Sequence, residues 1–350
     1  MVNSNTSFGK LNKVVVGREL QLERRLSDIT FRQFYREAIG EKIYESPIDE
    51  YHVTMDLIDL RNKELDDLEK TLSKYCKVYR PEPLTKIIPF STPSFKSELS
   101  SASNVRDLTL VYNDKLIETP TFVRNRYYEN TLLYDVYDEV TGGHNWIKAP
   151  HTKLTEDTID LEHWGDKRDY NNPPKNYVMA IDGAQFLRIG RDCIVNVNSY
   201  NHYKGYQWVK SFFPETDFHM IHVADNHIDG AIVSLCPGKF LVDPKYKGIE
   251  KLMPDQFKNW EYLYPENLTE EYNGPDIEMR LASSRGMDIN VLSIDENTVV
   301  VNKRAVGVKD ILDKHGFNVI EVTLENGEIF AGGIHCSTLD LDRDDEYIYY

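Results

Sequence analysis

Pairs of β-rich segments joined by tight turns recur along the chain and constrain its fold most strongly. Gly, Asn, Asp or Pro occupies the turn of each pair, which is the chemistry of a β-hairpin. The four pairs are residues 108–112 with 115–119, 186–189 with 193–197, 231–235 with 239–242, and 291–294 with 298–302. The sequence therefore predicts a fold in which antiparallel hairpins are the repeated element.

Helical segments lie between these hairpins. Residues 54–75 carry leucines at a spacing of three to four residues, and residues 308–315 predict a shorter helix that Gly316 ends. A short strand is predicted after each helix, at 78–80 and at 318–322. The unit is thus hairpin, helix and strand, which suggests a closed, propeller-like arrangement. An ordinary α+β domain with several hairpins fits the pattern equally well.

No segment reads as a linker between domains. Residues 81–93 and 255–275 are predicted to be long loops. Neither marks a boundary, so residues 1–350 are expected to form a single domain.

Composition excludes several classes of function. The formal net charge of −16 over 350 residues leaves no basic face for a nucleic acid. No apolar run approaches the roughly 18 residues that span a bilayer, and the first residues lack the pattern of a signal peptide. The four cysteines stand far apart, without a CxxC or zinc-like spacing. We therefore expect a cytoplasmic protein with reduced thiols that binds neither membrane nor nucleic acid.

Three short segments, 181–184, 226–230 and 332–338, place reactive side chains beside apolar runs. Taken singly, Asp182 could be a turn residue, His227 a structural histidine and Cys336 a buried thiol. Together they supply a nucleophile, a general acid or base, and carboxylates, including Asp229, that suit a planar cation. Attack of a thiolate on a guanidinium carbon fits this set of residues.

The same segments resemble the arginine:glycine amidinotransferase family of guanidino-group-modifying enzymes. Where those enzymes have Phe-Asp-Ala-Ala-Asp-Phe-Ile-Arg-x-Gly-Arg-Asp, this chain has Ile181-Asp-Gly-Ala-Gln-Phe-Leu-Arg-Ile-Gly-Arg-Asp192. Their His-Ile-Asp, Gly-Pro-Gly and Gly-Gly-Phe-His-Cys motifs are matched at 227–229, 236–238 and 332–336. Further similar stretches are 105–107, an Arg-x-Arg-aromatic-aromatic-Glu run at 124–129, 283–284 and 287–292.

The resemblance implies a fold, a reaction and a set of site residues. The fold would be a five-bladed α/β propeller, the pentein fold, with ββαβ modules about a pseudo-fivefold axis. The reaction would be ping-pong: Cys336 attacks the guanidinium carbon of arginine, His227 moves protons, and Asp182 orients His227. The predicted substrate-binding residues are Asp107, Asp229, Ser283, Ser284, Arg124 and Lys245. No metal or organic cofactor is implied, and a homodimer is expected.

Some positions depart from the family pattern and leave the substrates open. Where the family has the arginine that binds the donor carboxylate, this chain has Tyr246, flanked by Lys245 and Lys247. Gln185 and Asn226 also differ from the family residues. Two alternatives therefore stand beside transfer to glycine or another primary amine: a hydrolase that uses water, and a binding protein that retains only the fold.

Overall fold

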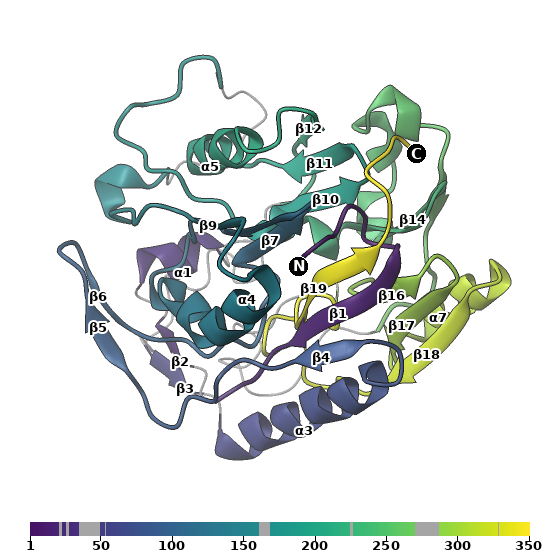
Figure 1. Ribbon diagram of the computed structural model, residues 1–350, viewed down its shortest axis with the longest axis horizontal. Helices are drawn as coiled ribbons and strands as arrows, with labels where there is room; N and C mark the ends of the chain where they lie inside the picture. Colours follow the sequence, from purple (N-terminus) through teal and green to yellow (C-terminus); the bar gives the residue numbers. More distant parts are fainter. Residues whose placement is uncertain are drawn as a thin grey trace.

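Five three-stranded sheets with one common pattern dominate the computed structural model (Figure 1), which describes residues 1–20, 23–25, 28–34, 50–52, 54–160, 169–224, 227–269, 287–327 and 329–350. In each sheet the first two strands are antiparallel, and the third is parallel to the second. The sheets are β7(Thr109–Tyr112)–β8(Lys115–Glu118)–β9(Trp146–Lys148), β10(Phe186–Ile189)–β11(Asp192–Asn196)–β12(Asp217–Ile221), β13(Ile232–Cys236)–β14(Lys239–Val242)–β15(Glu261–Leu263), β16(Leu292–Asp295)–β17(Thr298–Asn302)–β18(Asn318–Val322) and β19(Thr338–Asp344)–β1(Lys10–Val16)–β4(Lys77–Tyr79).

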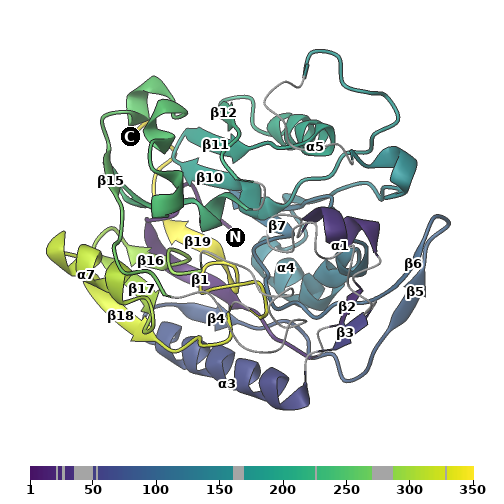
Figure 2. The ribbon, with the colours of Figure 1, turned by 180° about the vertical axis from the view of Figure 1, so that it is seen from behind.

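The sheet of β19, β1 and β4 joins segments from opposite ends of the sequence. β19 takes the position that the first hairpin strand holds in the other sheets, with Val16 opposite Thr338. Figure 2 shows β19 and β1 side by side from behind. Two small two-stranded antiparallel sheets complete the described strands: β2(Glu23–Arg25) with β3(Glu50–His52), and β5(Pro89–Ser91) with β6(Lys96–Glu98).

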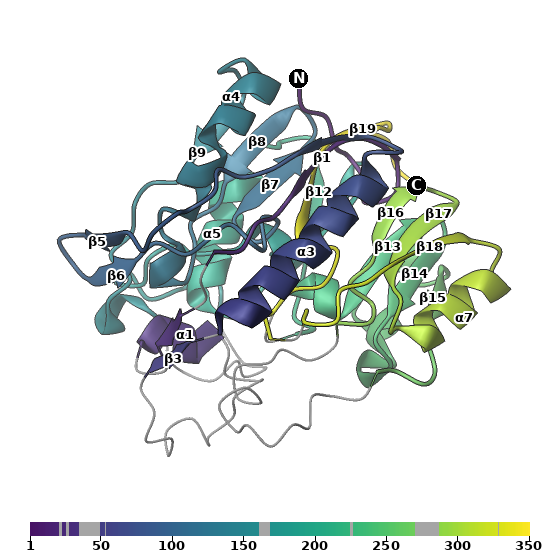
Figure 3. The ribbon, with the colours of Figure 1, turned by 90° about the horizontal axis from the view of Figure 1, so that it is seen from below.

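In four of these sheets an α-helix connects the second strand to the third. These helices are α3(Met55–Leu72), α4(Tyr134–Thr141), α5(Tyr200–Lys210) and α7(Val306–Lys314). In the sheet of β13–β15 the connection carries the 3-10 turns η7(Pro244–Tyr246), η8(Ile249–Lys251) and η9(Asp255–Phe257) instead. A shorter helix, α1(Ile29–Phe34), precedes α3. Figure 3 shows α3 along the outer side of the molecule, where it contacts β1, β4 and β18. None of the helices in the described residues has the length and apolar character needed to cross a membrane.

Five hydrophobic clusters lie between neighbouring sheets. Val111 of β7 packs with Val15 of β1, whereas Leu110 and Tyr112 of the same strand pack with Phe186 of β10. Because successive side chains of a strand point to opposite faces, most of these strands contribute to two clusters. Such clusters link each sheet to the next, and the sheet of β16–β18 to that of β1. This accounts for the nearly continuous apolar runs in the sequence.

The four predicted hairpins, both predicted helices and the strands after them are confirmed. The prediction of a long loop at 255–275 is wrong in part, because η9 and β15 form within it. The mixed α/β class is confirmed. Among the described residues the sheets remain separate and no closed sheet forms, so the five-bladed propeller stays a prediction.

A buried carboxylate on β19 ties several of these sheets together. Asp340 Oδ2 accepts hydrogen bonds from Arg188 at 2.6 Å, Arg343 at 2.8 Å and Ser4 at 2.9 Å. Its Oδ1 lies 2.6 Å from Arg106, in the segment before β7. Burial alone would raise the pKa of Asp340, but the three guanidinium groups hold it well below its usual range. Asp340 therefore joins β19, β10 and the approach to β7 at one point.

We expect Asp340→Asn to lower the free energy of unfolding by about 3 kcal/mol at neutral pH, because it leaves buried guanidinium groups without their counter-charge. Urea denaturation measures this loss. Since the folded pKa is depressed, the carboxylate's contribution is present above about pH 4 and is lost as the pH falls further. Asp342→Asn, which removes a partly exposed ion pair with Lys13, is the control and should cost less than about 1 kcal/mol. Equal losses in the two variants would contradict the role assigned to Asp340.

Candidate active site

Each of the five sheets contributes a polar side chain from the segment just before its first strand. In each sheet, the segment that leads into the first strand therefore also carries a polar side chain of the candidate site. These residues are Asp107 before β7, Asp182 before β10, His227 and Asp229 before β13, Asn290 before β16, and Cys336 before β19. The contacts below connect them.

The thiol of Cys336 is buried and has two polar neighbours. Its Sγ donates to Asp229 Oδ2 at 3.5 Å and accepts from Asn290 Nδ2 at 3.2 Å. Burial raises the pKa of the thiol well above its usual value, and the charges of Asp229 and Asp107 raise it further. The thiol is therefore protonated at neutral pH in the ligand-free protein.

The carboxylate of Asp229 is held by the residue next to the thiol. His335 Nδ1 lies 2.7 Å from Asp229 Oδ2. Burial, reinforced by the charge of Arg106, lowers the pKa of His335 to about 4, so its imidazole is neutral and donates. Burial would raise the pKa of Asp229, but the hydrogen bond from His335 and nearby positive charge bring it to about 2. Asp229 is thus ionised beside a neutral thiol.

His227 lies between two carboxylates. Its Nε2 is 2.9 Å from Asp182 Oδ2, and its Nδ1 is 3.4 Å from Asp107 Oδ1. Burial lowers the pKa of His227, but Asp107 and Asp182 outweigh burial and raise it to about 9. With both ring nitrogens facing acceptors, His227 is an imidazolium at neutral pH.

Asp107 and Asp182 also have capacity for a further donor. Arg126 binds Asp107 Oδ2 at 2.5 Å and forms a two-pronged pair with Glu129. The Oδ1 atoms of Asp107 and Asp182 are buried; among the described residues, Asp107 Oδ1 faces only His227 at 3.4 Å, and no hydrogen-bond donor reaches Asp182 Oδ1. Buried carboxylate oxygens are costly without donors, so this site is suited to a ligand rich in N–H groups.

Side chains on both sides hold the loop that carries Cys336. A Cβ on Gly333 would lie 2.6 Å from Asn290 Oδ1, and one on Gly332 would lie 1.9 Å from Asn104 Oδ1. The two glycines therefore allow two asparagine side chains to approach the backbone. Arg61, fully buried on α3, donates to Gly332 O of the same loop at 3.0 Å.

The structure brings together five of the residues predicted from the sequence: Cys336, His227, Asp182, Asp107 and Asp229. Ser283, Ser284 and Asn226 lie outside the described residues. Arg124 donates to Leu154 O at 2.9 and 2.7 Å and pairs with Asp28, rather than with a carboxylate of this cluster. Lys245 lies on η7, with its Nζ 5.3 Å from the ring centre of Tyr246. Binding roles for Arg124 and Lys245 stay predictions.

Sequence reasoning did not assign roles to three residues of this cluster. His335 and Asn290 contact Asp229 and Cys336, and Arg126 contacts Asp107. Two signals were available: His335 immediately precedes the cysteine, and Asn290 immediately precedes a hairpin strand, as Asp107 does. Fold and cluster together define a class of protein: a mixed α/β enzyme whose site presents a thiol, two imidazoles and three carboxylates.

Comparison with known proteins assigns this class more closely. No protein-family model matches the chain. The chain is 28% identical over 323 residues to the L-arginine:L-lysine amidinotransferase of Pseudomonas savastanoi pv. phaseolicola, covering 89% of this chain and 83% of that protein. An amidinotransferase of the saxitoxin biosynthetic pathway from Microseira wollei superposes with a TM-score of 0.82 at 28% identity, over 100% of this chain and 99% of the other.

A hydrolase shares the fold at lower similarity. The DDAH (dimethylarginine dimethylaminohydrolase) of Pseudomonas aeruginosa, complexed with citrulline, aligns with a TM-score of 0.57 and 11% identity, over 94% of this chain and 99% of that one. At that identity only the fold is compared. The resemblance predicted from the sequence is confirmed by the amidinotransferases: the protein is related to them, and its enzyme class is transferase.

Proposed function

We propose that the protein transfers the amidino group of L-arginine to a primary amine through a covalent adduct on Cys336. The observation that carries this proposal is the grouping of the Cys336 thiol with three buried carboxylates and the His227 imidazolium. The three carboxylates outnumber the His227 imidazolium and the Arg126 guanidinium that face them, which favours a cationic guest. A planar guanidinium can donate to several carboxylate oxygens at once, including Asp182 Oδ1, which lacks a donor among the described residues.

Binding of that cation also activates the nucleophile. Asp229 and Asp107 raise the pKa of Cys336 in the free protein. A guanidinium placed between them offsets their charge, so the pKa of the thiol falls when the substrate binds. The thiol then releases its proton to solvent, and the thiolate, which is the attacking form, appears only where a substrate carbon is available.

His227 carries the proton in both halves of the proposed reaction. Sγ of Cys336 forms a bond to the guanidinium carbon, the bond from that carbon to the ornithine nitrogen breaks, and the His227 imidazolium protonates the departing amine. An acceptor amine then attacks the amidino carbon, neutral His227 takes its proton, and the C–S bond breaks. Asp182 holds His227 in orientation throughout.

Water could replace the amine in the second half, as in a hydrolase. The amidinotransferases similar to this chain favour the amine, and the Pseudomonas savastanoi enzyme is named for transfer to lysine. Glycine, lysine and other primary amines are therefore the candidate acceptors.

Incubation of the protein with arginine, alone and with glycine, lysine or γ-aminobutyrate, tests this proposal. We expect ornithine in excess of one equivalent per enzyme, together with the matching guanidino compound, quantified by mass spectrometry, only when an acceptor is present. Continuous formation of ornithine and urea without an acceptor would establish that water attacks the adduct, and citrulline with ammonia would establish a hydrolase in which ammonia is the first leaving group. No product with any amine would leave a binding protein as the remaining interpretation.

We further infer that residues 1–350 form one domain in which the five sheets are the blades of a propeller around this site. The hydrophobic clusters shared by successive sheets support this arrangement. The homodimer implied by the family resemblance stays a prediction, which sedimentation equilibrium tests directly.

A further inference from the structure

The side-chain amide of Asn290 is placed between the thiol and the carboxylate of the site. Its Nδ2 lies 3.2 Å from Cys336 Sγ and 3.3 Å from Asp229 Oδ2. Its Oδ1 accepts the backbone N–H of Cys336 at 3.0 Å. Because that N–H can only donate, the amide oxygen must face it, and both amide hydrogens are left for the sulfur and the carboxylate.

The Asn290 amide contacts two groups whose negative charges would otherwise repel each other, the Asp229 carboxylate and the Cys336 thiolate. Asp229 is ionised, and its Oδ2 is 3.5 Å from the sulfur. When Cys336 becomes a thiolate, an anion forms next to an anion in a buried site, where charge interactions are strong. An N–H group directed at each of them lowers the energy of that state, and hydrogen bonds to ionised acceptors are among the stronger ones.

The surrounding backbone holds the amide in this place. Asn290 is 1% exposed, and its backbone carbonyl oxygen accepts the backbone N–H of His335 at 3.2 Å. The absence of a side chain at Gly333 allows the amide to reach the loop, since a Cβ there would lie 2.6 Å from Oδ1. Asn290 thus makes contacts with both His335 and Cys336.

We propose that Asn290 is a catalytic residue, which donates to the Cys336 thiolate and shields it from the charge of Asp229. This proposal rests on the proposed role of Cys336 as the nucleophile. A purely structural Asn290 would only hold the loop, and its loss would affect stability without changing how readily the thiol ionises.

Alkylation of Cys336 by iodoacetamide, followed as a function of pH in the full chain, separates these roles. Below the pKa of the thiol, the rate follows the thiolate fraction. We expect Asn290→Ala to slow alkylation at least about tenfold at about pH 8, the change that one pKa unit produces. Asn290→Asp, which keeps an acceptor for the Cys336 N–H but replaces the donor with a charge, should slow it further. Mass spectrometry of the labelled peptide confirms that Cys336 is the site.

Asn104→Ala is the matched control. Asn104 holds the same loop by donating to Phe330 O at 3.0 Å and Ala331 O at 3.2 Å, and these bonds reach neither the sulfur nor Asp229. Its loss should lower the melting temperature but change the alkylation rate less than about twofold. If both Asn290 variants fail to fold, Gly333→Ala is the substitute, because the added methyl group would push the Asn290 amide out of its place without changing Asn290 itself. This variant should also slow alkylation.

The outcomes separate this proposal from the proposed function. Alkylation at the wild-type rate in Asn290→Ala, or equal slowing in Asn104→Ala, would overturn the role of Asn290 and leave Cys336 as the nucleophile. An amidino adduct on Cys336 after incubation with arginine, detected by mass spectrometry, tests the nucleophile independently. Absence of that adduct in an active wild-type enzyme would overturn both proposals.

Discussion

Cys336→Ser is expected to lower amidino transfer at least about ten-thousandfold. A serine hydroxyl keeps the shape of the thiol but ionises much less readily, and Asp229 and Asp107 raise the pKa of any acid at this position, as they do for the thiol. Even with a guanidinium bound, too little alkoxide forms to attack. Turnover with arginine and the best acceptor amine measures the loss, while the melting temperature should stay close to that of the wild type.

Cys76→Ser is the matched control for this substitution. Cys76 is a half-buried thiol whose Sγ contacts only Leu72 O among the described hydrogen-bond partners, at 3.5 Å. Its variant should retain nearly full turnover. Substantial activity in Cys336→Ser would remove the covalent route from the mechanism.

His227→Asn should lower turnover about a thousandfold, because proton transfer to the leaving amine and from the acceptor then has no carrier. The pKa of about 9 predicts the pH dependence. Release of ornithine in a single turnover should slow in the wild type as the pH rises through about 9, where the imidazolium is lost, and this decline should be absent in the variant. Since the folded pKa is raised, the stability contributed by the charged imidazole is complete below about pH 6.5 and disappears as the pH rises through about 9.

His219→Asn is the control for His227→Asn, because it breaks a similar pair outside the site. Nε2 of the partly exposed His219, on β12, lies 2.6 Å from Oδ1 of the buried Asp192, on β11. Turnover and its pH dependence should be unchanged in this variant. A His227→Asn enzyme with the wild-type pH profile would show that another group carries the proton.

Local pattern made the hairpins of four of the five sheets predictable, because a hairpin and its turn are neighbours in the sequence. The left-handed turn residues Asn113, Gly190 and Gly238 mark three of these hairpins. The fifth sheet, formed by β19, β1 and β4, has no local turn that joins its two antiparallel strands. Val16 pairs with Thr338, and no local feature of either strand specifies a partner so distant in the sequence.

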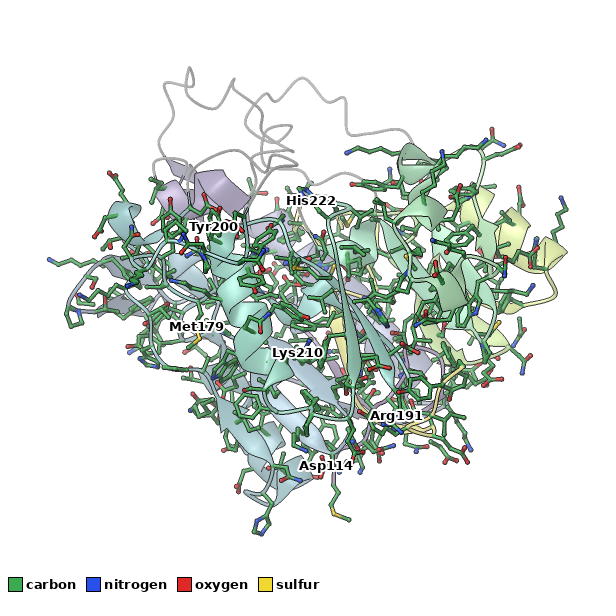
Figure 4. All side chains as sticks on the ribbon, turned by 90° about the horizontal axis from the view of Figure 1, so that it is seen from above. Asp114, Met179, Arg191, Tyr200, Lys210 and His222 are labelled. Carbon is green, nitrogen blue, oxygen red and sulfur yellow. The ribbon has the colours of Figure 1, made fainter. Side chains whose placement is uncertain are left out.

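The helix α5 was not predicted, for a different physical reason. Its sequence, YNHYKGYQWVK, is rich in aromatic residues and contains Gly205, all of which weaken helix propensity. Packing determines the structure there, since a Cβ on Gly205 would lie 2.6 Å from Ile181 Cγ2. Figure 4 labels Tyr200 and Lys210 at the two ends of this helix, with His222 near the Tyr200 end.

Within the candidate site, the sequence predicted the residues of the proposed reaction but not the partners that contact them. Cys336, His227 and Asp182 lie in motifs whose chemistry is evident from residue type. Asn290 before a strand has the character of an ordinary turn residue, and only its distances to Sγ and Asp229 support the role proposed above. The run at 124–129 likewise gave no reason to prefer Arg126 over Arg124, although it is Arg126 that reaches Asp107.

The pairing of β19 with β1 has a consequence for when the enzyme becomes active. Cys336 immediately precedes β19, and β19 is the strand that pairs with β1 and brings Asp340 to its arginine partners. Four of the sheets can form from segments already synthesised before the thiol leaves the ribosome. The thiol of Cys336 is then positioned by the strand pairing of greatest sequence separation among the described sheets, which is expected to form late because it requires closure of a very long loop. Under the proposed function, chemical competence is thus expected to be a late event of folding.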